Sequence, residues 1–109
     1  MSDVIKVLTE ANFDATIAAD GGLVLIDFYA DWCAPCKLLA PIIEDIADGY
    51  ADRITVGKVD ADAHPELLKR YGVRGLPTLL LLKGGQEVGR SFMLTRTRLA
   101  AMIESNLPQ

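Results

Sequence analysis

The sequence has little cysteine, few aromatic residues and no excess of positive charge. Only 2 of its 109 residues are cysteine, and 6% are aromatic. Its 11 lysine and arginine residues are outnumbered by 15 acidic residues, which gives a formal net charge of -4. Nucleic-acid-binding proteins normally carry clustered positive charge. The charge balance therefore argues against a nucleic-acid partner.

Long apolar runs are also missing. The start of the chain, MSDVIKVLTE, has neither the positively charged head nor the apolar run of a signal peptide. No apolar run approaches the roughly 20 residues that a helix needs to span a bilayer. We therefore expect no membrane association and a soluble cytoplasmic protein, unless a signal was cleaved before this sequence begins.

Repeats, low-complexity tracts and charge blocks are absent from the sequence, so nothing in it indicates disorder. Half of the residues are hydrophobic, which is enough to build a core. The length suits one compact domain. We expect a single domain over residues 1–109.

The hydrophobic pattern predicts an alternation of strands and helices. Strands are expected at residues 4–8, 23–30, 53–59, 78–83 and 86–92, and helices at 9–19, 33–50, 64–72 and 95–107. In the first helix Thr9 is expected as the N-cap, with Phe13, Ile17 and Ala18 on one face, and Gly21-Gly22 is expected to end it. Pro41 is expected to bend the second helix. This order predicts an α/β fold with a mixed sheet, helices on both of its faces, and an antiparallel hairpin at one edge.

One acidic residue stands in an apolar strand. The segment LVLIDFYA, residues 23–30, is apolar at nearly every position, which favours a strand buried on both faces. Asp27 could face solvent, but Leu25, Ile26 and Phe28 leave no polar face for it. Burial should raise the pKa of its carboxyl group, which suits a general base acting through water.

The two cysteines stand in the segment DWCAPCK, residues 31–37. Metal ligation, a structural crosslink and reversible thiol–disulfide exchange could each explain the pair. Structural zinc needs four ligands, and the sequence offers only two sulfurs and the distant His64. His64 precedes Pro65, where a capping or solvent-exposed histidine is the better explanation. A static disulfide across so small a loop would add little stability and is rare in a reducing cytoplasm. Exchange is therefore the favoured chemistry.

The cysteine pair lies where the buried strand gives way to a helix. Cys33 is expected in the first helical turn, where unpaired N–H groups and the positive end of the helix dipole favour an anion. This position should lower the pKa of a free thiol, ordinarily about 8.5, towards neutrality. Cys36 is expected one turn later and pointing inward. We therefore predict an accessible thiolate at Cys33 and a protected thiol at Cys36.

Two segments resemble the thioredoxin family. DFYADWCAPCKLLAPI, residues 27–42, resembles its active-site segment, and YGVRGLPTLLLLKGG, residues 71–85, resembles a second family tract. The likeness runs essentially end to end and implies the thioredoxin fold, with a central mixed five-stranded sheet flanked by four helices. Thioredoxins are themselves a common example of a Cys-X-X-Cys motif with a lowered thiol pKa.

The resemblance implies catalytic roles for the matching residues. Cys33 would be the attacking thiolate and Cys36 the resolving thiol, while Pro35 would set the stability of the disulfide ring against reduction. Asp27 would be the buried carboxylate behind Cys36. Lys58 would be its neighbour, although a lysine in this strand could also extend along an edge to reach solvent.

The resemblance also implies a docking surface. Trp32 would shield the sulfurs and, with Ala34, form part of a flat surface, although this tryptophan could instead belong to the core. The backbone of Gly75 and Leu76 would pair with an extended substrate. Pro77 would be a cis-proline facing the disulfide. Only the resemblance implies this, because about 5–6% of X–Pro bonds in folded proteins are cis.

The sequence departs from the family pattern at three places. Ala34 replaces the usual glycine between the cysteines, and Tyr29 stands where tryptophan is usual. The segment RSFMLTR, residues 90–96, is about one residue shorter than the family's Val-Gly-Ala region and contains no glycine. Bulk at Met93 would hinder the close approach of a partner, so we expect a narrowed or shifted partner range.

The favoured function is the reduction of protein disulfides by dithiol–disulfide exchange. The resemblance implies a monomeric electron carrier of cell redox homeostasis that needs no bound cofactor or metal. A thioredoxin reductase, ultimately using NADPH, would restore the dithiol. Two alternatives stay open: an oxidase or isomerase of secreted proteins, disfavoured by the missing signal peptide, and a non-catalytic docking subunit or folding helper.

Overall fold

The computed structural model describes residues 4–20 and 22–108. Over these residues the elements are β1 (Lys6–Val7), α1 (Phe13–Asp20), β2 (Leu23–Tyr29), α2 (Ala34–Gly49), β3 (Thr55–Asp60), α3 (Pro65–Arg70), β4 (Thr78–Lys83), β5 (Gln86–Ser91) and α4 (Arg96–Glu104). The predicted order of strands and helices is confirmed, as is the α/β class with one mixed five-stranded sheet.

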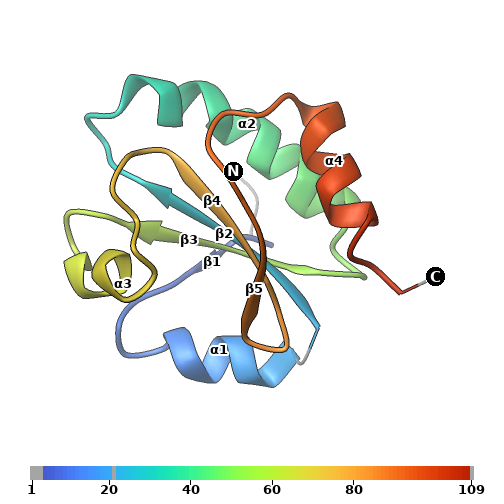
Figure 1. Cartoon of the computed structure of the whole chain (residues 1–109). Helices are drawn as coiled ribbons and strands as arrows, with labels where there is room; N and C mark the ends of the chain where they lie inside the picture. The colour runs from blue at the N-terminus through green and yellow to red at the C-terminus, as the bar shows by residue number, and fades with distance from the viewer. Residues whose placement is uncertain (1–3, 21, 109) are drawn as a thin grey trace.

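The five strands lie in the order β1-β3-β2-β4-β5. The pairs β1–β3 and β2–β3 are parallel, whereas β2–β4 and β4–β5 are antiparallel. Gly84 and Gly85 connect β4 to β5 with φ angles of 58° and 82°, a backbone region that glycine enters at little cost. The buried strand β2 therefore lies at the centre of the sheet, and the hairpin supplies one edge (Figure 1).

Two helices cover each face of the sheet. Helices α2 and α4 lie over one face, and α1 and α3 lie under the other (Figure 1). Successive β2 residues alternate between two cores because side chains of a strand point to opposite faces. Leu23 and Leu25 pack into the core beneath α2 and α4, whereas Val24, Ile26 and Phe28 pack into the core beneath α1 and α3. Period-two alternation therefore turns Asp27 towards α2.

The N-terminal elements begin and end differently from the sequence expectation. Strand β1 is only Lys6–Val7, and α1 begins at Phe13. Thr9 and Asn12 each accept a hydrogen bond from the other's backbone N–H, at 3.2 and 2.7 Å, so they close a turn before the regular helix. Ala18 is exposed, which corrects the prediction that it shares the buried face. Gly21 lies outside the described residues.

The later helices agree more closely with their predicted positions. Pro41 lies inside α2, as expected. Thr95 caps α4, and its side chain accepts the N–H of Arg98 at 3.2 Å. Leu107 follows the end of α4 and packs against the core beneath it. Within residues 4–20 and 22–108, no helix combines the length and apolar character needed to cross a membrane.

Candidate active site

The candidate site lies where β2 ends and α2 begins. Ala30 follows the strand, and its carbonyl oxygen accepts the N–H of Cys33 at 3.1 Å. Cys33 keeps an extended backbone, with φ −87° and ψ 104°, and occupies the N-cap position of α2. Pro35 stands in the first turn, where its missing N–H removes no helical hydrogen bond. The predicted junction is confirmed, with Cys33 capping the helix instead of lying within its first turn.

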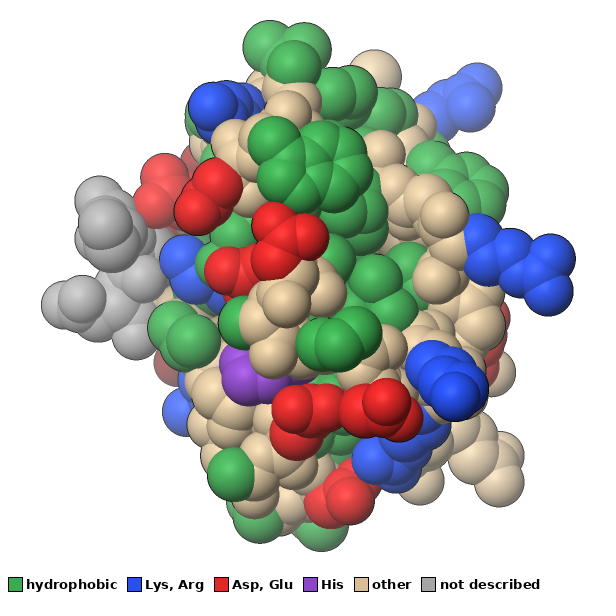
Figure 2. Space-filling view, turned by 90° about the vertical axis from the view of Figure 1, so that its left-hand side faces the viewer, with side chains coloured by type: hydrophobic (Ala, Val, Ile, Leu, Met, Phe, Trp, Pro, Cys, Tyr) green, Lys and Arg blue, Asp and Glu red, His purple; other side chains and the backbone are tan. Residues whose placement is uncertain are grey.

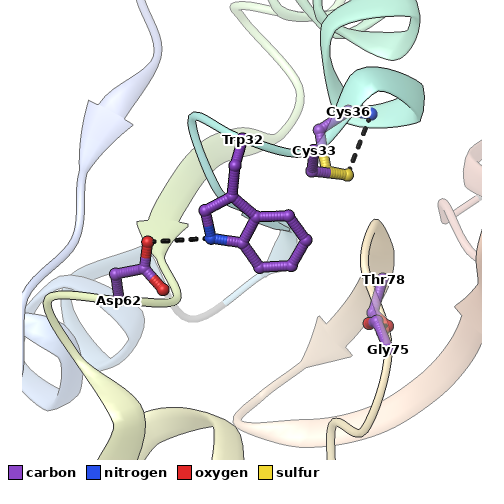
Figure 3. Close-up of a disulfide and its surroundings, with 6 residues drawn as sticks. All are labelled: Trp32, Cys33, Cys36, Asp62, Gly75 and Thr78. Carbon is purple, nitrogen blue, oxygen red and sulfur yellow. Dashed lines mark hydrogen bonds between the residues drawn. A yellow bond between two sulfur atoms is a disulfide. The ribbon is translucent and has the colours of Figure 1, made fainter.

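Cys33 and Cys36 form a disulfide, with 5.3 Å between their Cα atoms. The backbone N–H of Cys36 donates a hydrogen bond to the Sγ of Cys33 at 3.2 Å (Figure 3). Each cysteine is only 4% exposed, and Leu76 packs against the pair. Both cysteines are therefore buried in the disulfide form, and an accessible Cys33 thiolate in the reduced protein stays a prediction.

The helix start nevertheless favours charge on Cys33 once the disulfide is reduced. The N–H of Cys36 already points at the Cys33 sulfur, and a hydrogen bond to an anion is stronger than one to a neutral thiol. The positive end of the α2 dipole acts at the same atom. Both effects stabilise a Cys33 thiolate relative to the thiol.

Asp27 lies beneath the site. Its side chain is buried, and its Oδ1 atom has no hydrogen-bond partner. Burial raises the pKa of this carboxyl group to about 7, and the nearby Lys58 ammonium partly offsets the rise. Lys58 stands directly opposite Asp27 in the β2–β3 register. The structure thus confirms that Asp27 is buried and that Lys58 is its neighbour.

A cavity joins Asp27 to Cys36. It has a volume of about 150 Å³, and its walls include Asp27, Cys36, Tyr29 and Lys58. The lining is mostly apolar, but Asp27 and Lys58 bring charged groups into it, and a cavity of this size has room for water molecules. A proton can therefore pass between Cys36 and Asp27 through water, without direct contact between the two side chains.

Trp32 is exposed and held by a residue that the sequence analysis did not identify. The ring is 70% exposed, and its Nε1–H donates to Oδ2 of Asp62 at 3.0 Å (Figure 3). The side chain of Asp60 accepts the N–H of Asp62 at 3.0 Å and so shapes the loop after β3. Strands β2 and β3 are parallel, so the residues that follow both strands meet at one sheet edge. That shared edge is the signal that could have indicated Asp62.

We expect Asp62→Ala to release the Trp32 ring without altering the thiol chemistry. The ring should rotate more freely, which would lower the fluorescence anisotropy of this single tryptophan. The KM for a protein substrate should rise about two- to fivefold, the equivalent of one hydrogen bond of about 0.5–1 kcal/mol. Reduction of a small aromatic disulfide should be unchanged.

The matched control is Asp31→Ala, which removes the same charge beside Trp32 and leaves the indole hydrogen bond intact. An equal rise in KM for both variants would show that charge, and not the position of the ring, controls docking.

The loop before β4 faces the disulfide from the other side (Figure 3). The Leu76–Pro77 peptide bond is cis, as the resemblance implied. The hydroxyl of Thr78 donates a hydrogen bond to the carbonyl oxygen of Gly75 at 2.6 Å. This bond connects the residues on either side of Leu76 and Pro77 and so stabilises the loop. Gly75 is exposed and Leu76 half-buried, so the backbone at the tip of this loop is open to an approaching peptide.

The segment without glycine borders this loop. Leu79 pairs with Ser91, and continuing that antiparallel register places residues 92–93 beside residues 77–78. Phe92 is 59% exposed and Met93 is 46% exposed. Figure 2 shows apolar side chains distributed over the face that lies on the left of Figure 1. Bulky apolar groups therefore stand where a partner would meet the loop.

His64 was expected to cap a helix or face solvent. It occupies the N-cap position of α3, but its side chain makes no capping hydrogen bond. The side chain is 21% exposed, and its Nδ1 lies 3.5 Å from Oε1 of Glu10. Among the described residues, no three His, Cys, Asp or Glu side chains come together as a metal-binding group.

Comparison with known proteins gives one consistent answer. The thioredoxin family model matches residues 4–105. A thioredoxin from Acidithiobacillus ferridurans is 43% identical over 108 residues, which cover 98% of this chain and 100% of that protein. A thioredoxin from Allochromatium vinosum is 40% identical, over 96% of this chain and 99% of that protein. One from Pseudomonas aeruginosa is 37% identical, over 98% of this chain and 100% of that protein.

Proposed function

The chain belongs to the thioredoxin family, and from this premise we propose how its residues carry out thiol–disulfide exchange. It is a thiol–disulfide oxidoreductase that reduces protein disulfides through its own cysteine pair. The observation that carries the proposal is the Cys33–Cys36 disulfide at the start of α2, with the buried Asp27 in the wall of the same cavity.

Reduction proceeds in two exchange steps. The Cys33 thiolate attacks one sulfur of the substrate disulfide, forming a mixed disulfide and releasing the other substrate sulfur as a thiolate. Cys36 then loses its proton and attacks the Sγ of Cys33, which releases the second substrate thiolate. The substrate gains two electrons and takes up two protons, and the protein loses two electrons as its own disulfide forms.

Asp27 manages the proton of the second step. As a carboxylate it accepts the Cys36 proton through water in the cavity. A pKa of about 7 matches this task, since the group can both accept and return a proton near neutral pH. Lys58 stabilises the charged form of the carboxyl. Pro35 limits the flexibility of the ring and so sets its stability against reduction.

The docking surface surrounds the disulfide. The backbone of Gly75 and Leu76 pairs with an extended substrate segment. Pro77 places that segment against the sulfurs, while Trp32 and Ala34 supply the flat surface on the other side. The exposure of Trp32 and of the loop tip supports this assignment.

The proposed partners are disulfide-containing proteins and a thioredoxin reductase that draws on NADPH. The chain would act as a cytoplasmic, single-domain monomer over residues 1–109, without a bound cofactor. The experiment that tests this role is insulin reduction coupled to NADPH oxidation through a thioredoxin reductase. The matched control is the double variant Cys33→Ser, Cys36→Ser, which should be inactive.

Two results would replace the proposal. A double variant that kept its activity would indicate a non-catalytic docking or folding role. A redox titration that gave the potential of a strong oxidant would indicate an oxidase or isomerase.

We expect turnover with a generic bacterial thioredoxin reductase to be impaired by Met93, because its side chain is exposed where the family commonly has glycine. Reduction of a small disulfide should be near normal. Met93→Gly should raise kcat/KM with that reductase about fivefold, the equivalent of about 1 kcal/mol from one steric contact. The measurement is the steady-state kinetics of the wild type and of Met93→Gly with the reductase.

Val88→Gly is the control, because it places glycine at another exposed apolar position of the same strand region. Equal kcat/KM for wild type and Met93→Gly would show that Met93 is not the obstacle.

A further inference from the structure

Lys58 lies between an aromatic ring and the buried carboxyl group. Its Nζ is 5.6 Å from the centroid of the Tyr29 ring, within the range of a cation–π interaction. Lys58 pairs with Asp27 in the β2–β3 register. Tyr29 is two residues beyond Asp27 and so lies on the same face of β2. All three side chains line the cavity that contains Cys36.

We propose that Tyr29 is a positioning residue for the resolving step, because its ring holds the Lys58 ammonium in the wall of the cavity that Asp27 and Cys36 share. The inference rests on the proposed role of Asp27 as the proton acceptor for Cys36. It concerns a position at which the sequence departs from the family's usual tryptophan.

The ring is needed because a lysine side chain is flexible. Its ammonium sits on a four-carbon stem and is strongly attracted to water. Lys58 is half-buried, and Asp60 stands two residues later on the same face of β3. Without the ring, the ammonium could turn to solvent or to Asp60. The Tyr29 ring blocks that movement and keeps the charge near Asp27.

Several other polar groups surround Asp27, but Lys58 is the cation that lowers the pKa of its carboxyl group. From α2, Glu44 lines a second, smaller cavity beside Asp27, and Lys37 lines the first together with Cys36. Asp31, which follows β2, also lines the first cavity. From β4, the residue opposite Asp27 is the apolar Leu79.

The electrostatics agree with this geometry. Burial is the larger influence on the pKa of Asp27, and Lys58 is the charge that lowers it. The pKa of Tyr29 is itself raised, first by burial and then by the nearby carboxylates of Asp60, Asp31 and Asp27. The phenol therefore stays neutral near pH 7, and its ring face is available to the ammonium.

The test follows the titration of Asp27 directly, by the ¹³C chemical shift of its carboxyl carbon in the disulfide form. Tyr29→Leu removes the ring and should raise the midpoint by about half a pH unit, the size of an exposed cation–π interaction. Tyr29→Phe keeps the ring and should leave the midpoint unchanged. In a Lys58→Met background, Tyr29→Leu should have no further effect.

A second measurement connects the titration to the reaction. The reduced protein is mixed with the aromatic disulfide DTNB, and the second release of the nitrothiobenzoate anion reports attack by Cys36. In Tyr29→Leu this phase should be about threefold slower at pH 6, because a half-unit shift lowers the carboxylate fraction by that factor. The rates of all variants should converge above pH 9, where Asp27 is deprotonated in each.

An unchanged Asp27 midpoint in Tyr29→Leu overturns the inference. The inference is also overturned if Tyr29→Phe shifts the Asp27 midpoint as much as Tyr29→Leu does. The same holds if Tyr29→Leu still shifts the midpoint in the Lys58→Met background. Failure of the proposed function looks different: Asp27→Asn would then leave the second phase unchanged, while the Tyr29→Leu titration would still move.

Discussion

Replacing Cys36 with serine is expected to stop multiple turnover and to leave Cys33 joined to the substrate in a stable mixed disulfide. Cys33 caps α2, and the Cys36 N–H points at its sulfur, so the attacking thiolate keeps its stabilisation in Cys36→Ser. The second exchange then has no nucleophile, because serine does not replace a thiol in disulfide exchange. Reduction of insulin should fall to the uncatalysed level.

The trapped adduct is measured by non-reducing electrophoresis and mass spectrometry. Cys33→Ser is the matched control, and it should give neither turnover nor adduct. In reduced wild type, iodoacetamide at neutral pH should label Cys33 before Cys36. Adducts in Cys33→Ser, or earlier labelling of Cys36, would reverse the two roles.

Replacing Asp27 with alanine is expected to slow the resolving step and to stabilise the fold. The carboxyl group is buried, and its Oδ1 has no hydrogen-bond partner. A rise in pKa from 3.8 to about 7 corresponds to about 4 kcal/mol of penalty for the charged form. The loss of packing atoms offsets part of the gain. We expect Asp27→Ala to raise the free energy of unfolding by about 1–3 kcal/mol above pH 7.

The gain in the free energy of unfolding from Asp27→Ala should increase as the pH rises. Between pH 3.8 and about 7, the folded protein keeps a proton on Asp27 that the unfolded chain has lost. Wild-type stability therefore falls as the pH rises through this window. The advantage of Asp27→Ala should be absent near pH 4, grow through the window and level off above pH 7.

Denaturant melts of both redox forms across this pH range provide the measurement. Asp27→Asn keeps the volume and isolates the charge, and Asp52→Asn changes an exposed acid as a control. A clear loss of stability at pH 8 in Asp27→Asn would show instead that the carboxylate stabilises the fold. The second phase of the DTNB reaction should slow in Asp27→Asn and stay unchanged in Asp52→Asn.

Local patterns in the sequence were sufficient for the order of elements and for the position of the cysteine pair. A strand that is apolar at adjacent positions must be buried on both faces, so Asp27 could be recognised as a buried acid from its neighbours alone. The change from strand to helix periodicity placed Cys33 at a helix start. Glycines at 84 and 85 indicated the hairpin because a tight turn needs positive φ angles.

Local patterns were insufficient where regular structure is short or frays. The turn closed by Thr9 and Asn12 delays the start of α1. Ala18 is exposed because, at about 100° of rotation per residue, it lies outside the face on which Phe13 and Ile17 are buried. The burial of Cys33 depends on Leu76, which is distant in the sequence. The cis peptide bond before Pro77 was predicted from the resemblance to the thioredoxin family, and no local sequence pattern indicated it.

Tertiary structure alone decided which side chains meet around the disulfide. The bond from Trp32 to Asp62 spans 30 residues, and it exists because β2 and β3 are parallel and end at the same edge. The position of Lys58 between Asp27 and Tyr29 depends on the register of those same strands. Hydrophobic periodicity determines which face of a strand is buried. Register determines which residues of neighbouring strands stand opposite each other, and only the folded sheet fixes it.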